Sequence, residues 1–169
     1  NKFGVSENIF FNLFNHIKNS ENLRLKCLSV HIGSQILDVR PYERMLKVLD
    51  KVIKKTKFDF DYIDLGGGMG IDYNKNNINL NFKKYCLSIK KFLKNHDSKI
   101  IFEPGRSIIG NTGILISKII YIKESYKKNF IILDAAMNDL LRPALYGAEH
   151  HIIPVKKDNS KSNKVYEFV

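Results

Sequence analysis

The 169-residue sequence has no tryptophan, only two cysteines and only four prolines. Cys27 and Cys86 have neither the number nor the spacing of a disulfide framework or a zinc site, which favours a reducing, cytoplasmic compartment. No apolar run approaches the ~20 residues needed to span a bilayer, and the first residues lack the basic start and apolar core of a signal peptide. These absences predict an unexported protein with no membrane span and no structural metal.

Arginine is also scarce, although the formal net charge is +11. Such a charge would permit nucleic-acid binding by electrostatics alone. The positive charge is mostly lysine, however, and it is scattered over the polar faces of the expected helices without interleaved aromatic residues. We therefore expect no nucleic-acid partner. The five arginines, Arg24, Arg40, Arg44, Arg106 and Arg142, are more informative, because the planar guanidinium binds a carboxylate or a phosphate through two parallel hydrogen bonds.

Strand-like and helix-like segments alternate regularly through the first two thirds of the chain. Apolar residues recur at helical spacing from Ile9 to Ile17, with Ser6 as the expected cap, and again from Tyr42 to Ile53 and from Phe82 to Leu93. The intervening short strands are expected at "LKCLSVH", "DYIDL" and "KIIF". Alternation of this kind with short connections predicts parallel βαβ units, and so an α/β fold.

The pattern changes at about Thr112. Four strand-like runs follow without long helices between them: 112–125, 129–135, 150–155 and 164–169. We therefore expect βα units over 1–111 and the beginning of a β-rich domain over 112–169. The chain begins with Asn1 and ends in a run typical of an unfinished strand, so we expect an internal piece of a longer protein.

The three expected βα strands lead into "HIGSQ", "GGGMG" and "EPGRS". In parallel α/β folds the functional groups gather at the carboxyl ends of the strands, so these three segments are expected to form one site. Each segment also has a purely structural interpretation. His31 alone could be an ordinary strand-end histidine, the glycines could make a tight turn, and Glu103 with Arg106 could form a salt bridge.

Taken together, these segments favour a planar, phosphorylated ligand that contains a ring nitrogen. Pyridoxal phosphate has these properties. A carboxylate beside its pyridine nitrogen keeps that nitrogen protonated, which makes the ring an electron sink. An imidazole can stack on the ring, while glycine N–H groups and the Ser34 hydroxyl can hold the phosphate.

The motifs "HIGSQI", "DLGGGMGI", "EPGRSIIGNTGIL" and above all "DAAMNDLLRPALYGAEHHI" closely resemble the diaminopimelate decarboxylase family, a branch of the alanine-racemase-like, pyridoxal-phosphate-dependent decarboxylases. The first three motifs are shared more loosely with ornithine and arginine decarboxylases, whereas the last is more specific. The resemblance covers nearly the whole chain. It implies the C-terminal part of a pyridoxal-phosphate-binding TIM (β/α)8 barrel, followed by the start of a β-rich domain.

The resemblance also implies roles for individual residues. His31 matches the histidine that stacks on the cofactor ring, Glu103 the acid that pairs with the pyridine nitrogen, and Arg106 a substrate-contacting arginine as well as part of the cofactor-proximal turn. Arg142 and Tyr146 match residues that grip the distal carboxylate of the substrate. The expected cofactor-binding set is His31, Ser34, Gly66, Gly67, Gly68, Glu103, Pro104, Gly105 and Arg106.

By the same resemblance, the cofactor-linking lysine lies upstream of Asn1 and an acid/base cysteine lies downstream of Val169. The segment therefore contains no catalytic residue and is expected to be inactive alone. The implied reaction converts meso-diaminopimelate to L-lysine and carbon dioxide, in a homodimer with shared active sites. Three alternatives stay open: a decarboxylase acting on ornithine, arginine or a carboxylated polyamine such as carboxynorspermidine, a non-catalytic pyridoxal-phosphate-binding homologue, and a nucleic-acid-binding role.

Overall fold

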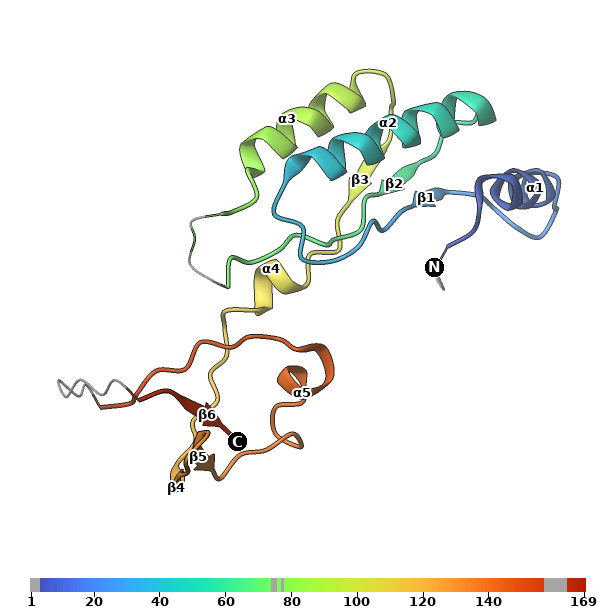
Figure 1. Cartoon of the computed structure of the whole chain (residues 1–169). Helices are drawn as coiled ribbons and strands as arrows, with labels where there is room; N and C mark the ends of the chain where they lie inside the picture. Colours follow the sequence, from blue (N-terminus) through green and yellow to red (C-terminus); the bar gives the residue numbers. More distant parts are fainter. Residues whose placement is uncertain (1–3, 74–75, 77, 157–163) are drawn as a thin grey trace. The chain divides into compact units, whose positions relative to one another are not determined.

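The computed structural model describes residues 4–73, 76, 78–156 and 164–169. The chain divides into two compact units, Asn1–Thr112 and Gly113–Val169. The first unit carries the three helices and three strands expected from the alternating pattern. The second unit carries short strands and one short helix (Figure 1).

The first unit is built on a parallel sheet of three strands in the order β1-β2-β3. These strands are β1 (Cys27–Ser29), β2 (Tyr62–Asp64) and β3 (Lys99–Ile101). Three long helices alternate with them: α1 (Glu7–Lys18), α2 (Val39–Thr56) and α3 (Phe82–Leu93). Helices α2 and α3 lie side by side on one face of the sheet (Figure 1). The parallel order with intervening helices confirms the predicted βαβ units.

Each long helix begins at a residue whose side chain accepts a hydrogen bond from the first turn. Ser6 accepts from the backbone N–H of Ile9, Asp38 from Arg40, and Asn81 from Lys84. These bonds satisfy N–H groups that have no partner inside the helix, and such caps typically contribute about 1 kcal/mol. The Ser6 cap confirms the start predicted for the first helix.

The apolar faces of the helices pack on the sheet to form the core of the first unit. Tyr42, Ile63 and Leu65 have no exposed surface, which places the centre of the core between α2 and β2. At the far end of α2, the Phe58 ring meets those of Phe14 and Phe60 edge to face, with centroids 5.6 and 5.0 Å apart, and the Phe14 and Phe60 rings are tilted against each other at 6.4 Å. Aromatic contacts of this geometry stabilise a core beyond the area that they bury.

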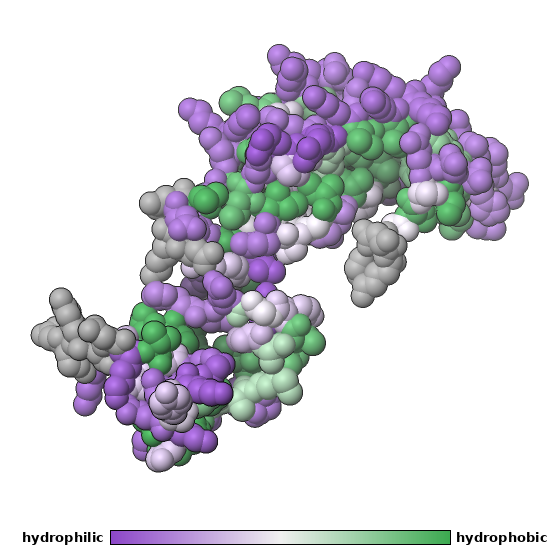
Figure 2. Space-filling model, viewed as in Figure 1, coloured by the Kyte–Doolittle hydropathy of each residue, from purple (hydrophilic) through white to green (hydrophobic). Residues whose placement is uncertain are grey.

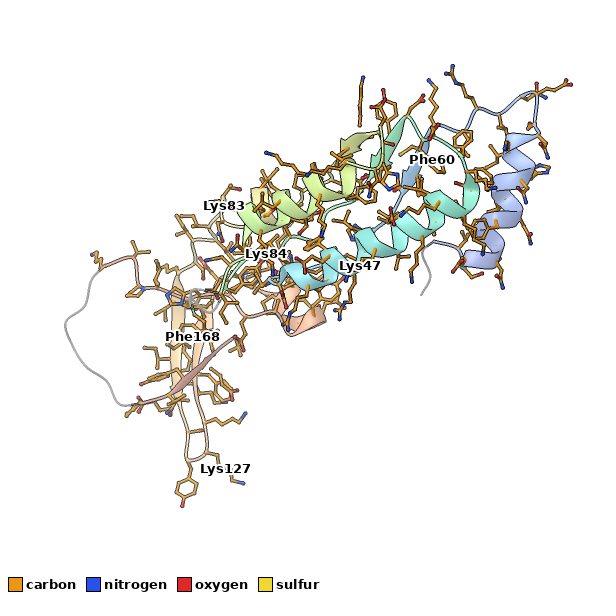
Figure 3. All side chains as sticks on the ribbon, turned by 90° about the horizontal axis from the view of Figure 1, so that it is seen from above. Lys47, Phe60, Lys83, Lys84, Lys127 and Phe168 are labelled. Atoms are coloured by element: carbon orange, nitrogen blue, oxygen red, sulfur yellow. The ribbon has the colours of Figure 1, made fainter. Side chains whose placement is uncertain are left out.

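The lysines occupy the opposite, solvent-facing sides of the helices. Lys47 on α2 and Lys83 and Lys84 on α3 are all exposed (Figure 3). Hydrophilic residues predominate on the outer side of these two helices in the space-filling view (Figure 2). The lysines are therefore solvated side chains on amphipathic helices. None of the described helices is both long and apolar enough to cross a membrane.

The second unit contains β4 (Ile119–Glu124), β5 (Asn129–Leu133), β6 (Tyr166–Phe168) and the short helix α5 (Arg142–Tyr146). β4 pairs antiparallel with β5, which pairs parallel with β6. Two sequence predictions were wrong here. Residues 112–118 precede β4 instead of forming its first half, and 150–155 form no strand. Pro154 has no N–H to give to a sheet, which accounts for the second difference.

Candidate cofactor site

The carboxyl ends of the three parallel strands meet, as the sequence predicted. The hydrogen-bonded ladder continues past the strands: the Val30 N–H donates to the Asp64 carbonyl at 2.9 Å and the Leu65 N–H to the Ile101 carbonyl at 3.0 Å. The Glu103 N–H then donates to the Gly66 carbonyl at 2.8 Å. The segments after β2 and β3 are therefore joined directly. A short helix, α4 (Arg106–Ile109), follows this junction.

The glycine turn, defined here as Gly66–Gly68, lies at the centre of this junction. Gly66 and Gly68 have φ angles of +63° and +86°, which side chains disfavour. Gly67 is required for a different reason: a Cβ atom built on it would lie 2.1 Å from the carbonyl oxygen of Glu103. The structural interpretation of the glycines as a tight turn is thus correct. The Gly68 N–H nevertheless has no hydrogen-bond partner within the described ranges.

His31 lies against the glycine turn, and its side chain is exposed instead of belonging to the core. The Gly67 N–H donates to the His31 Nδ1 atom at 3.4 Å, so the turn and the imidazole are in contact. The following loop packs equally closely, because a Cβ atom on Gly68 would lie 2.3 Å from the Gly33 carbonyl oxygen. Ser34 in the same loop is exposed. The structure therefore brings His31 and the glycine turn together.

Glu103 and Arg106 do not form the salt bridge that a purely structural interpretation requires, nor any other ion pair among the described residues. The Arg106 Nη1 atom instead donates to the Tyr73 hydroxyl at 3.2 Å, and its guanidinium carbon lies 5.8 Å from the Tyr73 ring centroid. Pro104 and Gly105 connect the two charged residues and are exposed. Sequence reasoning did not find Tyr73, which follows the glycine turn by five residues.

Two further residues that the sequence analysis missed contact the glycine turn. The Asp64 carboxylate accepts from the Gly66 N–H at 2.8 Å, and the Tyr42 hydroxyl donates to the Gly67 carbonyl at 3.2 Å. Burial raises the pKa of the Tyr42 hydroxyl above its ordinary value, so it stays protonated and remains a donor at neutral pH. The sequence did offer one signal for Asp64, namely that an acidic residue lies two positions before the first glycine of the turn.

Arg142 and Tyr146 belong to the second unit. Both lie on α5 four residues apart, and the Arg142 guanidinium carbon is 5.5 Å from the Tyr146 ring centroid. Both are exposed, and Arg142 forms no ion pair in the part of the chain that the structure describes. A helix places residues i and i+4 on one face, so the charge and the hydroxyl are presented together.

The residues of the first unit fit pyridoxal phosphate. Among the described residues they supply a backbone N–H without a partner at Gly68, an exposed imidazole at His31 and an exposed carboxylate at Glu103 that forms no ion pair. These are the groups needed for a phosphate, an aromatic ring and a pyridine nitrogen. Within the described residues no cluster of His, Cys, Asp and Glu could hold a metal ion.

Residues 1–110 match the family model described as "Pyridoxal-dependent decarboxylase, pyridoxal binding domain". The chain belongs to this family. The match covers the whole alternating βα segment and all three loops of the site. Membership in the pyridoxal-dependent decarboxylases identifies the cofactor as pyridoxal phosphate and so confirms the cofactor predicted from the strand endings.

Relatives of known name extend the similarity through the second unit. Diaminopimelate decarboxylase of Aquifex aeolicus is 42% identical over 95% of this chain, and that of Neisseria meningitidis serogroup A is 37% identical over 94%. The chain spans only 39% and 40% of the lengths of these two relatives.

Solved structures of diaminopimelate decarboxylases are similar to this chain as well. Diaminopimelate decarboxylase from Helicobacter pylori, complexed with L-lysine, aligns with a TM-score of 0.85 at 37% identity, over 94% of this chain and 40% of that one. The enzyme from M. jannaschii, also in complex with L-lysine, aligns with a TM-score of 0.87 at 32% identity, over 99% and 41%. These likenesses confirm the predicted α/β fold, a part of the TIM-type barrel of this family followed by a β-rich segment.

Proposed function

We propose that this chain is part of a decarboxylase that converts meso-diaminopimelate to L-lysine and carbon dioxide. The observation that supports it best is the pairing of Arg142 and Tyr146 on α5, in a chain that also carries a pyridoxal-type site. The relatives named diaminopimelate decarboxylase, two of them complexed with L-lysine, support the same substrate. We also propose that the boundary between the barrel and the β-rich domain lies near residue 112.

On the cofactor side, the proposal assigns roles to residues that follow each of the three strands. The Gly68 N–H and the Ser34 hydroxyl hold the phosphate, together with Gly105 and Arg106. His31 packs on the face of the ring, and the Glu103 carboxylate hydrogen-bonds the protonated pyridine nitrogen. When bound, the cofactor supplies an electron sink for the electron pair that the departing carboxylate leaves behind. Glu103 sustains that property by keeping the nitrogen positively charged.

On the substrate side, we propose that Arg142 and Tyr146 bind the distal carboxylate of the substrate, which is not released as carbon dioxide. A guanidinium and a hydroxyl four residues apart can donate to the same carboxylate, and Arg106 adds a second cation. A substrate that ends in an amine would leave these donors unpaired, which is costly in a closed site. This arrangement therefore selects diaminopimelate against ornithine and arginine.

The cofactor-linking lysine and the acid/base cysteine are proposed to lie outside this chain, in the remaining length that the relatives have. We also propose a cytoplasmic homodimer with shared active sites. The experiment must therefore use the full-length protein that contains this sequence, because the groups that react are assigned to other segments.

The test is carbon dioxide release from meso-diaminopimelate, ornithine and arginine, measured with added pyridoxal phosphate. We expect turnover of meso-diaminopimelate alone. Arg142→Ala should lower kcat/KM on the order of 10- to 100-fold, the loss of one charge-assisted hydrogen bond. Arg24→Ala is the matched control, because Arg24 is another exposed arginine of this chain and is assigned no role in the site. Its kcat/KM should equal that of the unmodified protein.

Three results would contradict the proposal. Release from ornithine, arginine or a carboxylated polyamine instead of diaminopimelate would assign the protein to a sister decarboxylase. If no substrate gave carbon dioxide although the cofactor was bound, the protein would be a non-catalytic homologue. Equal activity of the Arg142→Ala and Arg24→Ala variants would remove the role given to Arg142.

A further inference from the structure

We propose that Tyr42 and Asp64 are positioning residues of the cofactor site, which fix the glycine turn so that the Gly68 N–H is presented to the phosphate. This inference rests on the proposed cofactor-binding role of the turn. Neither residue is assigned a contact with the cofactor. Both act through the backbone of Gly66 and Gly67, one from the sheet and one from α2.

Asp64 is a nearly buried carboxylate, with 9% of its surface exposed. One oxygen accepts from the Gly66 N–H at 2.8 Å, and the other accepts from the Ser29 hydroxyl on β1 at 3.2 Å. A buried charge is costly unless it is hydrogen-bonded, and a hydrogen bond from a backbone N–H to a carboxylate is among the stronger ones. The carboxylate therefore locks the first peptide of the turn onto two neighbouring strands.

Tyr42 acts on the peptide that joins Gly67 to Gly68. Its side chain has no exposed surface, and its hydroxyl donates to the Gly67 carbonyl at 3.2 Å. Tyr42 lies on α2 beside the core residues Met45 and Leu46, so the position of its ring is set by the packing of the whole helix. The hydroxyl therefore fastens the turn to the buried core of the first unit.

These two hydrogen bonds add to three others that hold the backbone of the glycine turn. The Gly66 carbonyl accepts from the Glu103 N–H, the Gly67 N–H donates to His31 Nδ1, and the Gly68 carbonyl accepts from the Ile36 N–H. Only the Gly68 N–H is left without a partner among the described residues. Because each peptide is planar, fixing the Gly67 carbonyl also fixes the direction of the N–H of Gly68. The turn thus presents one oriented donor for an anion.

Tyr85 provides a matched control. It is also buried, with 2% of its surface exposed, and its ring centroid lies 4.4 Å from that of Tyr42. Its hydroxyl, however, has no hydrogen-bond partner in the described structure. Tyr42→Phe and Tyr85→Phe therefore remove the same atom from the same part of the core, and only the first change releases the glycine turn.

The experiment compares the affinities of the cofactor-free, full-length protein for pyridoxal phosphate and for pyridoxal, which lacks the phosphate. The measured quantity is the ratio of the two dissociation constants, so a change in general stability or in ring binding cancels. Tyr42→Phe should reduce the preference for the phosphorylated form roughly 2- to 10-fold, the value of one neutral hydrogen bond. Tyr85→Phe should leave the ratio unchanged.

Asp64 is tested with two variants. Asparagine can still accept from the Gly66 N–H while its amide faces the Ser29 hydroxyl, so Asp64→Asn should retain most of the preference. Asp64→Ala removes both hydrogen bonds and should reduce the preference for pyridoxal phosphate more than Tyr42→Phe does.

The outcomes separate this inference from the proposed function. If the unmodified protein binds pyridoxal as tightly as pyridoxal phosphate, the proposed phosphate site itself is wrong, and the inference falls with it. If the unmodified protein prefers pyridoxal phosphate but Tyr42→Phe and Tyr85→Phe give equal ratios, the site stands and the positioning role of Tyr42 is refuted. An Asp64→Ala variant that keeps the full preference would refute the role of Asp64.

Discussion

Among the glycines, Gly67 leaves the least room for an added Cβ atom, so Gly67→Ala is expected to disturb the site strongly. The new Cβ atom would lie 2.1 Å from the carbonyl oxygen and 3.0 Å from the carbonyl carbon of Glu103. Both are backbone atoms, so no flexible side chain can move aside. The loop that carries Glu103 must shift by roughly 1 Å to restore an ordinary van der Waals separation.

Two costs follow from that shift. Overpacking of a well-packed site typically destabilises a fold by about 1–3 kcal/mol. The displacement also moves the Glu103 carboxylate relative to the glycine turn, and a misplacement of about 1 Å in a site can lower activity on the order of 100-fold. Because two groups of the proposed site move apart, we expect the loss of activity to exceed what the loss of stability explains.

The assay measures kcat/KM for carbon dioxide release, the pyridoxal phosphate dissociation constant and the thermal unfolding of the full-length Gly67→Ala protein. Gly113→Ala is the control, since a Cβ atom there meets nothing within 4 Å and its φ angle is not positive. The control should match the unmodified protein in all three measurements. A Gly67→Ala protein with unchanged kcat/KM would show that the turn and Glu103 do not need their close approach.

Three further predictions concern other residues. Glu103→Gln removes the charge proposed to keep the pyridine nitrogen protonated, so kcat should fall on the order of 100-fold or more, and an unchanged kcat would contradict that role. Gly105→Ala should leave thermal unfolding unchanged, because a Cβ atom there meets nothing within 4 Å of the chain, yet weaken pyridoxal phosphate binding; equal binding would place the cofactor elsewhere. Hydrogen bonds from Lys54 and, to a smaller extent, from the His96 ring lower the pKa of the Asp50 carboxyl. Its ionised form therefore stabilises the fold above the unfolded-state pKa near pH 4 and loses that contribution as the pH falls through the lower folded-state value. Urea titrations should show Asp50→Asn less stable than the unmodified protein at pH 7 and equal to it in strong acid, and a constant difference at every pH would refute the assignment.

Local signals predicted the elements of the first unit well. The apolar stripe from Tyr42 to Ile53 and the cap at Ser6 depend on neighbours in the sequence, and both are found in the structure. The region after residue 112 was harder, because strand-like composition does not say whether a partner strand exists. Residues 150–155 have suitable apolar residues but no pairing, and Pro154 removes a donor.

The sequence by itself determined the chemistry that the chain can offer: an imidazole, a glycine turn and a carboxylate, each following a strand, and an arginine with a tyrosine four residues later. Only the tertiary structure decided how these groups are held. The Tyr42 hydroxyl and the Gly67 carbonyl that it bonds lie 25 residues apart in the chain, and a hydrogen bond between such distant segments leaves no periodic pattern in a sequence. The same holds for the approach of Gly67 to Glu103, because the space available to a Cβ atom is a property of two packed backbones.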